Sequence, residues 1–189
     1  MFSIYRKSIG LLIMFVLAAA MPVFGHDTTW PGEKLERMYP AASSYEQRNL
    51  YISSPQRQRI EQELGEPLRE EDLKPSVYFA VIKKNPEAKP KRAAVMIFID
   101  AEGANDIIET GIVLNSTGML EELMIFENRE PPAISNPVFL SQFKNKKHTD
   151  PFQVGKDIQA PPGLEKTARA IASGARRGML IINELFKRR

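Results

Sequence analysis

The chain has 189 residues, 26% of them charged and 43% hydrophobic, which is the composition of one globular domain with its own core. It contains no cysteine, which excludes disulfides, thiol nucleophiles, cysteine-held iron–sulfur clusters, cysteine zinc sites and an acylated lipoprotein anchor. The formal net charge is +3, but residues 1–25 hold two of the 26 basic residues and no acidic one. The remaining residues therefore carry 24 basic and 23 acidic side chains, and this nearly neutral balance does not indicate nucleic-acid binding.

Residues 1–25 have the pattern of a secretory signal peptide. Arg6 and Lys7 form a basic start, residues 9–24 are apolar, and Val23 and Gly25 are small residues at the cleavage positions. The apolar run is shorter than the roughly 20 residues that a membrane-spanning helix needs. We therefore expect a periplasmic protein, or one anchored to the inner membrane if the segment is not cleaved.

Residues 26–50 are polar and contain two prolines, which predicts an irregular lead-in to a domain over residues 51–189. The first predicted helix follows at once. Ser53 or Ser54 is a suitable N-cap, Pro55 suits the first turn, and Gly65 ends the helix.

Strand signals dominate the middle of the chain. Residues 76–84 and 92–100 are rich in β-branched and aromatic side chains, and the second run is apolar on both faces, which predicts a central strand. Residues 106–115 and 119–128 flank the turn sequence NSTG, which predicts a hairpin, although the apolar residues of the latter run do not alternate strictly.

A short helix, a long connection and a long helix complete the predicted order of elements. Asn136 and Pro137 are suited to begin the short helix after a Pro-rich loop. The long helix carries apolar residues at spacings of three, four and seven, namely Leu164, Ala168, Ile171, Ala175, Ile182 and Leu185. The fold class expected is α+β, an antiparallel sheet packed with a short N-terminal helix and a long C-terminal helix.

Few local patterns indicate chemistry. The break Pro161-Pro162-Gly163 before a helix is typical of an anion site, although every helix start has such free N–H groups. His26 would be the N-terminal residue after cleavage and, with its amine, could bind copper. The basic runs at 83–92 and 144–148 fit either solvated loops or contacts with anionic lipid or an acidic partner. No pattern of a hydrolase is present, and Glu121-Glu122 are expected to be exposed.

Residues 76–186, and most clearly the parts FLSQFKNKK, DPFQVGKDI and the helix after them, resemble the FMN-binding domain family. This exported flavin domain occurs in the C subunit of the sodium-pumping NADH:quinone reductase, in the G subunit of the Rnf complex and in NosR-type regulators. The resemblance implies an FMN-binding-domain-like fold and an electron-transfer role beside a membrane redox complex or another exported redox protein.

The family attaches FMN through its phosphate to a threonine in a short loop. Its pattern is Asp, two residues, Ser or Thr, Gly, Ala, Thr, one residue, then Ser or Thr. Asp157 leads into the corresponding segment here, Gly163 matches the glycine and Thr167 keeps a hydroxyl.

Three departures change what the resemblance implies. Pro162 replaces the Ser or Thr, Leu164 replaces the Ala, and Glu165 replaces the acceptor threonine. A carboxylate is a poor acceptor for the phosphodiester, and it repels the FMN phosphate by about 1 kcal/mol at ~4 Å in water. We expect Glu165 instead to satisfy N–H groups of the first helical turn, and Thr167 remains an alternative acceptor on another side of the helix.

The sequence therefore predicts a cofactor loop made of Gly163, Leu164, Glu165, Lys166 and Thr167 that is no longer suited to covalent FMN. Non-covalent FMN is compatible with it. The hypotheses are an electron carrier, a flavin-free binding or assembly module that keeps the fold, and a copper protein using His26. None of them is a stand-alone enzyme, and none involves nucleic acid.

Overall fold

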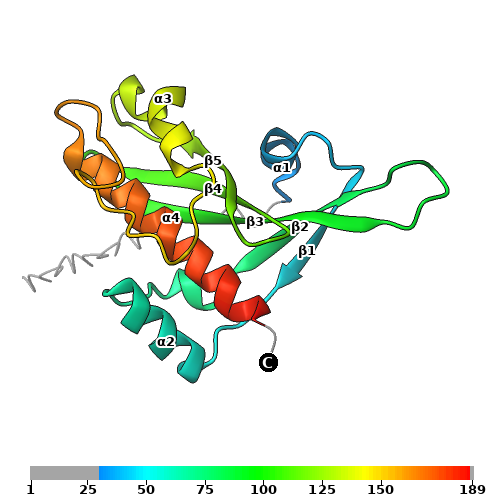
Figure 1. Ribbon diagram of the computed structural model, residues 1–189. Helices are drawn as coiled ribbons and strands as arrows, with labels where there is room; N and C mark the ends of the chain where they lie inside the picture. Colours follow the sequence, from blue (N-terminus) through cyan, green and yellow to red (C-terminus); the bar gives the residue numbers. More distant parts are fainter. Residues whose placement is uncertain (1–29, 188–189) are drawn as a thin grey trace, which may run out of the picture. The chain divides into compact units, whose positions relative to one another are not determined.

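In the computed structural model, residues 30–187 are described, and all of their helices and strands belong to the unit that begins at Pro31. Figure 1 shows its elements. The helices are α1 (Gly32–Met38), α2 (Ser54–Leu64), α3 (Pro137–Leu140) and α4 (Glu165–Phe186). The strands are β1 (Ser44–Asn49), β2 (Ser76–Ile82), β3 (Lys91–Glu102), β4 (Ile107–Asn115) and β5 (Leu120–Glu127), and short 3-10 turns lie at Glu71–Leu73, Pro132–Ser135 and Ser141–Phe143.

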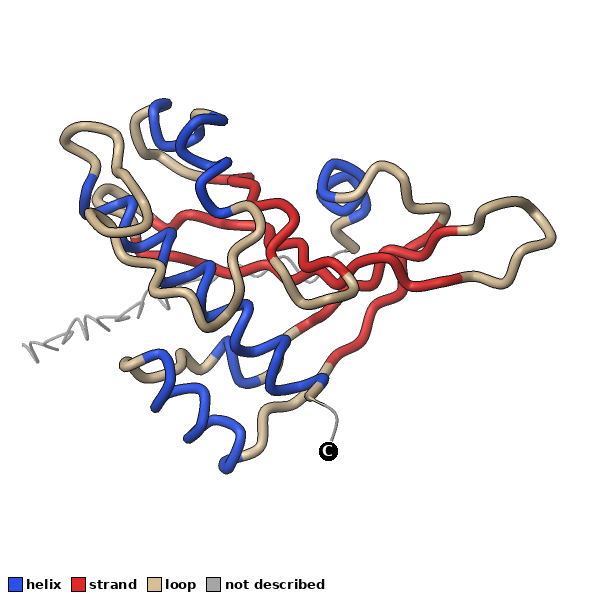
Figure 2. The backbone as a smooth tube through the Cα atoms, viewed as in Figure 1, coloured by secondary structure: helices blue, strands red, loops and turns tan. Residues whose placement is uncertain are grey.

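Within this range the five strands form one antiparallel sheet in the order β1-β2-β3-β4-β5, so every strand pairs with its neighbours in the chain. The α+β class is confirmed, and so is the central position of β3. The NSTG turn closes the β4–β5 hairpin, where the Gly118 N–H donates to the Asn115 carbonyl at 2.9 Å. Figure 2 shows the strands as one continuous layer with helices on both sides.

The missing alternation in β5 has a structural cause. Val113 pairs with Glu122 and Leu114 pairs with Leu120, so Glu121 is an extra residue in the β5 side of the ladder. Such a β-bulge shifts the pattern of inward and outward side chains by one residue. The period of two therefore breaks at Glu121 although the segment is a strand.

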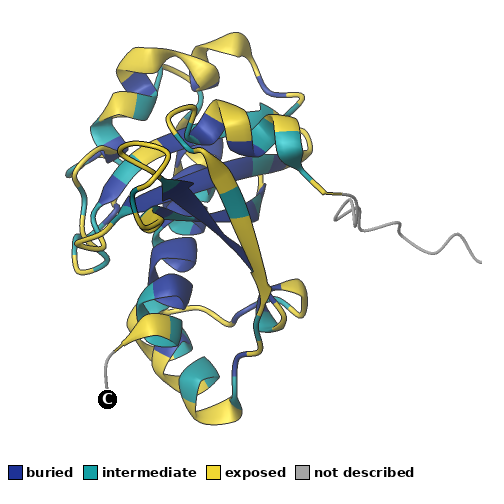
Figure 3. Ribbon diagram, turned by 90° about the vertical axis from the view of Figure 1, so that its right-hand side faces the viewer, coloured by how far each residue is buried: buried dark blue, intermediate teal, exposed yellow. Residues whose placement is uncertain are grey.

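One face of the sheet is covered by α4, with α2 packed against α4. The larger core cluster lies here and includes Ile97 and Ile99 of β3, Ile112 of β4 and Ile171 of α4. Figure 3 shows the central strands and the middle of α4 in the buried colour, with the exposed residues mainly in the loops, on the outer helix faces and along β1. The apolar stripe predicted for α4 is confirmed: its four middle members are buried, and Leu164 and Leu185 pack partly buried against the same core.

The opposite face carries a second, smaller core beneath α1. Leu35 and Met38 of α1 pack here on Tyr78, Met96 and other residues of the sheet. The irregular lead-in predicted up to residue 50 is thus wrong from Gly32 onward, because α1 buries two apolar side chains and β1 pairs with β2. A helix of one to two turns has too little periodicity to be seen in sequence, and β1 is exposed at nearly every position.

A buried ion pair joins α4 to the segment before β2. Arg177 and Asp72 are 4% and 6% exposed, and the Arg177 Nε lies 3.2 Å from the Asp72 Oδ2. The Arg177 Nη2 also donates to the Asp100 carbonyl of β3. Burial raises the pKa of the Asp72 carboxyl, an effect that the positive charge of Arg177 opposes. The pair fixes α4 against both elements, since removing one partner would leave a buried charge alone.

The helix ends follow the sequence closely. Ser53 is the N-cap of α2, where its N–H donates to the Gln56 Oε1 at 3.0 Å, and Gly65 ends the helix with a φ of 85°. Asn136 caps α3 by accepting the Val138 N–H at 2.8 Å. Among residues 30–187 no helix has the length and apolar character needed to cross a membrane.

The approach of α4 to the sheet depends on a missing side chain. A Cβ at Gly178 would lie 2.5 Å from the Ile112 Cδ1 and 3.0 Å from the Ile99 Cγ1, whereas one at Gly174 would lie 3.4 Å from the Ala101 Cβ, an ordinary contact. We expect Gly178→Ala to lower the free energy of unfolding by about 1–3 kcal/mol through overpacking. The matched control Gly174→Ala should raise it by up to about 1 kcal/mol, because alanine favours helix. Urea denaturation measures both, and equal stability of the two variants would contradict this packing.

Candidate functional site

The segment that leads into α4 is held by Asp157. Its carboxylate accepts the Gln153 N–H at 2.6 Å, the Phe152 N–H at 3.1 Å and the Lys146 Nζ at 2.7 Å. Burial alone would raise the pKa of Asp157, but Lys146 and the two N–H groups outweigh it and hold the pKa below its usual value. Phe152 sits at a φ of 53° with its side chain buried, a conformation that costs a bulky residue energy. These contacts give the loop a defined path to residue 163.

Gly163 and Glu165 form a small contact of their own at the start of α4. Gly163 has a φ of 77°, which favours glycine, and its N–H donates to the Glu165 Oε1 at 3.3 Å. Leu164 is the N-cap and contributes no side-chain cap. The expectation that Glu165 satisfies first-turn N–H groups is therefore corrected in detail, since its carboxylate accepts the N–H of Gly163 in the loop before the helix.

Thr167 turns the other way and is fully buried. Its hydroxyl donates to the Glu130 Oε2 at 2.8 Å, and the Glu130 Oε1 accepts the Asn105 N–H at 2.7 Å. Glu130 is 8% exposed. Burial would raise the pKa of Glu130, but the N–H groups around Asn105 and the Thr167 hydroxyl together lower it. This carboxylate thus joins the first turn of α4 to the β3–β4 turn.

The five predicted loop residues therefore do not face one site. Gly163, Glu165 and Lys166 are exposed, Leu164 is partly buried against the core, and Thr167 is inside. In this arrangement the Thr167 hydroxyl is not accessible as an acceptor. Sequence reasoning missed Glu130, because a glutamate before two prolines gives no sign of burial, and the residues that surround it come from distant segments.

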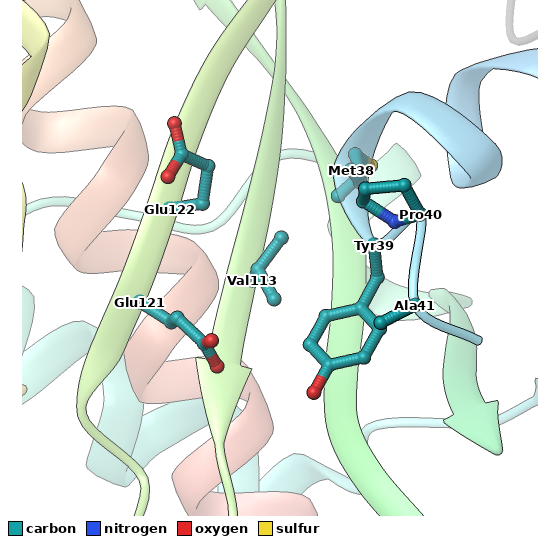
Figure 4. Close-up of a pocket in the computed structure, with 7 residues that line it drawn as sticks. All are labelled: Met38, Tyr39, Pro40, Ala41, Val113, Glu121 and Glu122. Carbon is teal, nitrogen blue, oxygen red and sulfur yellow. The ribbon is translucent and has the colours of Figure 1, made fainter. Parts of the chain in front are cut away.

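A hollow of about 280 Å³ lies on the α1 side of the sheet (Figure 4). Figure 4 shows Glu121 and Glu122 of β5 on one side, the end of α1 and the chain after it on the other, and Val113 of β4 between them. The bulge at Glu121 explains why two consecutive glutamates line the same hollow. Glu122 is exposed and Glu121 is half-buried, so the expectation that both are exposed holds only for Glu122.

That hollow is not part of the predicted loop. It is lined by Met38, Tyr39, Pro40, Ala41, Val113, Glu121 and Glu122. A wider, open hollow next to it is lined by residues of α1, by Pro40 and by residues 42–45. Neither includes any residue from 163 to 167. The helix start and the two hollows are separate surface features.

Metal ligands do not gather in the described part of the chain. Among residues 30–187 no group of three or more His, Cys, Asp or Glu side chains is placed to hold a metal ion. His26, the residue of the copper hypothesis, lies outside the described residues, as does the predicted signal peptide. The copper hypothesis therefore stays a prediction from the sequence.

A search of protein-family models gave no match to this chain, and a search of curated proteins gave no similar sequence. The relationship to FMN-binding domains therefore stays a prediction from the sequence.

The Thr167–Glu130 contact predicts a measurable loss of stability. Thr167→Val keeps the shape of the side chain but removes the hydroxyl that Glu130 accepts. We expect the free energy of unfolding to fall by about 1–3 kcal/mol, because a buried carboxylate loses a partner. Thr149→Val, at an exposed threonine, is the control and should change it by less than about 0.5 kcal/mol. Chemical denaturation of both variants decides the point.

The lowered pKa of Glu130 predicts a pH dependence of stability. The ionised carboxylate stabilises the fold above its unfolded pKa, near 4.5, and this contribution disappears as the pH falls through the lower folded value. Glu130→Gln should therefore be less stable than the wild type at neutral pH, and the difference should shrink below about pH 4.5. A stability difference that stays constant down to the acid limit would show that the charge of Glu130 contributes nothing.

Proposed function

We propose that this protein is an exported, FMN-binding-domain-like component of electron transfer at the outer face of a membrane, with no covalent FMN at the usual loop. The observation that carries the proposal is the exposed start of α4. The residue at the family's acceptor position, Glu165, is the first residue of a long C-terminal helix and is open to solvent.

The arrangement of the chain supports the proposed fold relationship. The resemblance covers residues 76–186, and this span comprises β2, β3, β4, β5, α3 and α4. The segment aligned with the attachment loop leads directly into the helix that covers the sheet, where backbone N–H groups and the helix dipole favour an anion. A flavin phosphate attached or bound there would be accessible from solvent.

The side chains of the loop oppose covalent attachment. Glu165 lacks the hydroxyl that a phosphodiester needs, and its carboxylate already accepts the Gly163 N–H. Thr167, the alternative acceptor, is buried and donates to Glu130. A non-covalent FMN phosphate at this place would have to displace the Glu165 carboxylate from Gly163, and two anions close together repel each other.

The same contact favours a second candidate, a flavin-free binding or assembly module that keeps the fold. In that case Glu165 replaces the phosphate permanently and fixes the loop. The two hollows on the α1 side support this candidate as well, because neither adjoins the loop. Export is proposed from the basic and apolar pattern of residues 1–25, and the partner proposed is a membrane redox complex or another exported redox protein.

Co-production with a flavin transferase tests the absence of attachment. We expect the wild-type chain to give no fluorescent band in a denaturing gel, since position 165 has no hydroxyl. Leu164→Ala together with Glu165→Thr should give such a band, because it restores the acceptor in an exposed position. The matched control is Leu164→Ala with Glu165→Gln, which removes the charge but supplies no hydroxyl, and it should stay dark. A fluorescent wild type that loses its band on Thr167→Ala would contradict the proposal.

Absorption spectroscopy separates the two candidate functions. The electron carrier is supported if the native protein has a flavin spectrum and if denaturation releases that flavin from the polypeptide as a small molecule. A colourless protein that gains no bound spectrum from added FMN supports the flavin-free module. If the protein is the flavin-free module, the Glu165→Gln variant should still bind no FMN, because removing the negative charge at residue 165 does not by itself create a flavin site.

A further inference from the structure

The loop between β2 and β3, together with the first residue of β3, is a strongly basic exposed segment that the proposed function leaves unexplained. Residues 83–91 read KKNPEAKPK, and we name this segment the basic tip. It contains Lys83, Lys84, Lys89 and Lys91, all exposed, and a single acidic residue, Glu87. Figure 1 shows the tip extending beyond the body of the sheet, away from α4 and α3.

The lysines of the basic tip have no counter-charge of their own. None of the four forms an ion pair with any residue from 30 to 187, whereas the next residue, Arg92, pairs with Glu46 at 2.6 Å. Arg92 also lies over the Phe79 ring, 4.4 Å from its centroid. Arg92 is therefore held on the sheet by an ion pair, whereas the lysines of the basic tip have no such partner among residues 30–187.

From these observations we infer that the basic tip docks the domain on an anionic lipid surface, through the phosphate groups of the lipids. Four like charges in one short loop repel each other, and a layer of phosphates relieves that repulsion. Lysine is a strongly hydrated point charge on a flexible stem, which suits diffuse contact with many headgroups better than paired recognition of one carboxylate.

The composition of the tip favours lipid over an acidic protein. Protein interfaces are depleted in lysine, and their binding energy comes mainly from Trp, Tyr and Arg side chains in desolvated pockets. Apart from the lysines and Glu87, the tip offers only Asn85, Pro86, Ala88 and Pro90. It has no aromatic or large apolar side chain to anchor a protein partner or to stack on a base.

Docking through the basic tip has a consequence for the rest of the domain. The tip and the start of α4 lie at opposite ends of the unit in Figure 1. A domain that rests on the membrane by its tip presents the Gly163–Glu165 loop to the aqueous side, where a soluble partner can reach it. This inference does not depend on flavin, so it stands or falls separately from the proposed function.

The absence of cysteine in the chain makes a direct test possible. Two single-cysteine variants of the full chain, Ala88→Cys in the tip and Val138→Cys on α3, each give one labelling position. Val138 is 76% exposed. Energy transfer from a fluorophore at each cysteine to headgroup-labelled lipid is measured on vesicles of phosphatidylcholine and on an equal mixture with phosphatidylglycerol. We expect the label at 88, and not that at 138, to approach the lipid on the anionic vesicles, and high salt should reverse the approach.

Charge variants complete the test. Changing Lys83, Lys84, Lys89 and Lys91 to Gln should abolish the approach, with a loss of about five-fold in affinity for each lysine removed. The matched control changes Lys144, Lys147, Lys156 and Lys166 to Gln, four exposed lysines outside the tip with the same total charge, and should keep it. Equal energy transfer on both kinds of vesicle, or equal loss in both variants, would overturn the inference. Binding of the tip to polyglutamate but not to anionic vesicles would overturn it too, and would identify an acidic protein as the partner.

Discussion

The contact that orients the C-terminal helix is the close approach of α4 to the sheet at Gly178, next to the buried Arg177. A Cβ at Gly178 would lie 2.5 Å from the Ile112 Cδ1, so this side of α4 packs closely on the sheet. Thr167 lies three turns before Gly178 on the same side of the helix, so it must face inward, where Glu130 receives its hydroxyl. Glu165 is two residues earlier, about 200° around the helix, and must face outward. The packing of the middle of the helix thus decides which loop residue is buried and which is offered to solvent.

This packing bears on the proposed relationship of the loop to a flavin attachment loop. Attachment of FMN through a phosphodiester needs a hydroxyl, whereas the solvent-facing residue at the start of α4 carries a carboxylate that accepts the Gly163 N–H. The hydroxyl that remains in the segment is on the buried side. Loss of covalent attachment would therefore follow from two residues and one helix orientation, without any change in the sheet. If the basic tip, at the turn of the β2–β3 hairpin, contacts a membrane, the loop before α4 stays free.

Much of the fold could be predicted from sequence because its signals are local. Ser53 and Gly65 bound α2, Asn136 begins α3, and the NSTG turn closes the β4–β5 hairpin, each through contacts within a few residues. The stripe on α4 is equally local. Helix α1 and strand β1 could not be predicted, since α1 is short and β1 is held mainly by pairing to β2 rather than by its own side chains. The bulge at Glu121 hid the alternation of β5 for the same reason, because a register shift is set by the partner strand.

The candidate site likewise has one part that local sequence predicts and another part that depends on tertiary contacts. The break at Gly163 before the helix and the position of Thr167 on another side of the helix from Glu165 were expected from residues close in sequence, whereas Glu130 is brought to Thr167 by the tertiary fold alone. We propose that residue 165 carries no covalent flavin, and the intact mass of the mature protein purified from cells that contain a flavin transferase is the sharpest test of this proposal. We expect the mass of the unmodified polypeptide. A mass increased by one FMN group, with the modification mapped to a peptide containing residues 165–167, would contradict it.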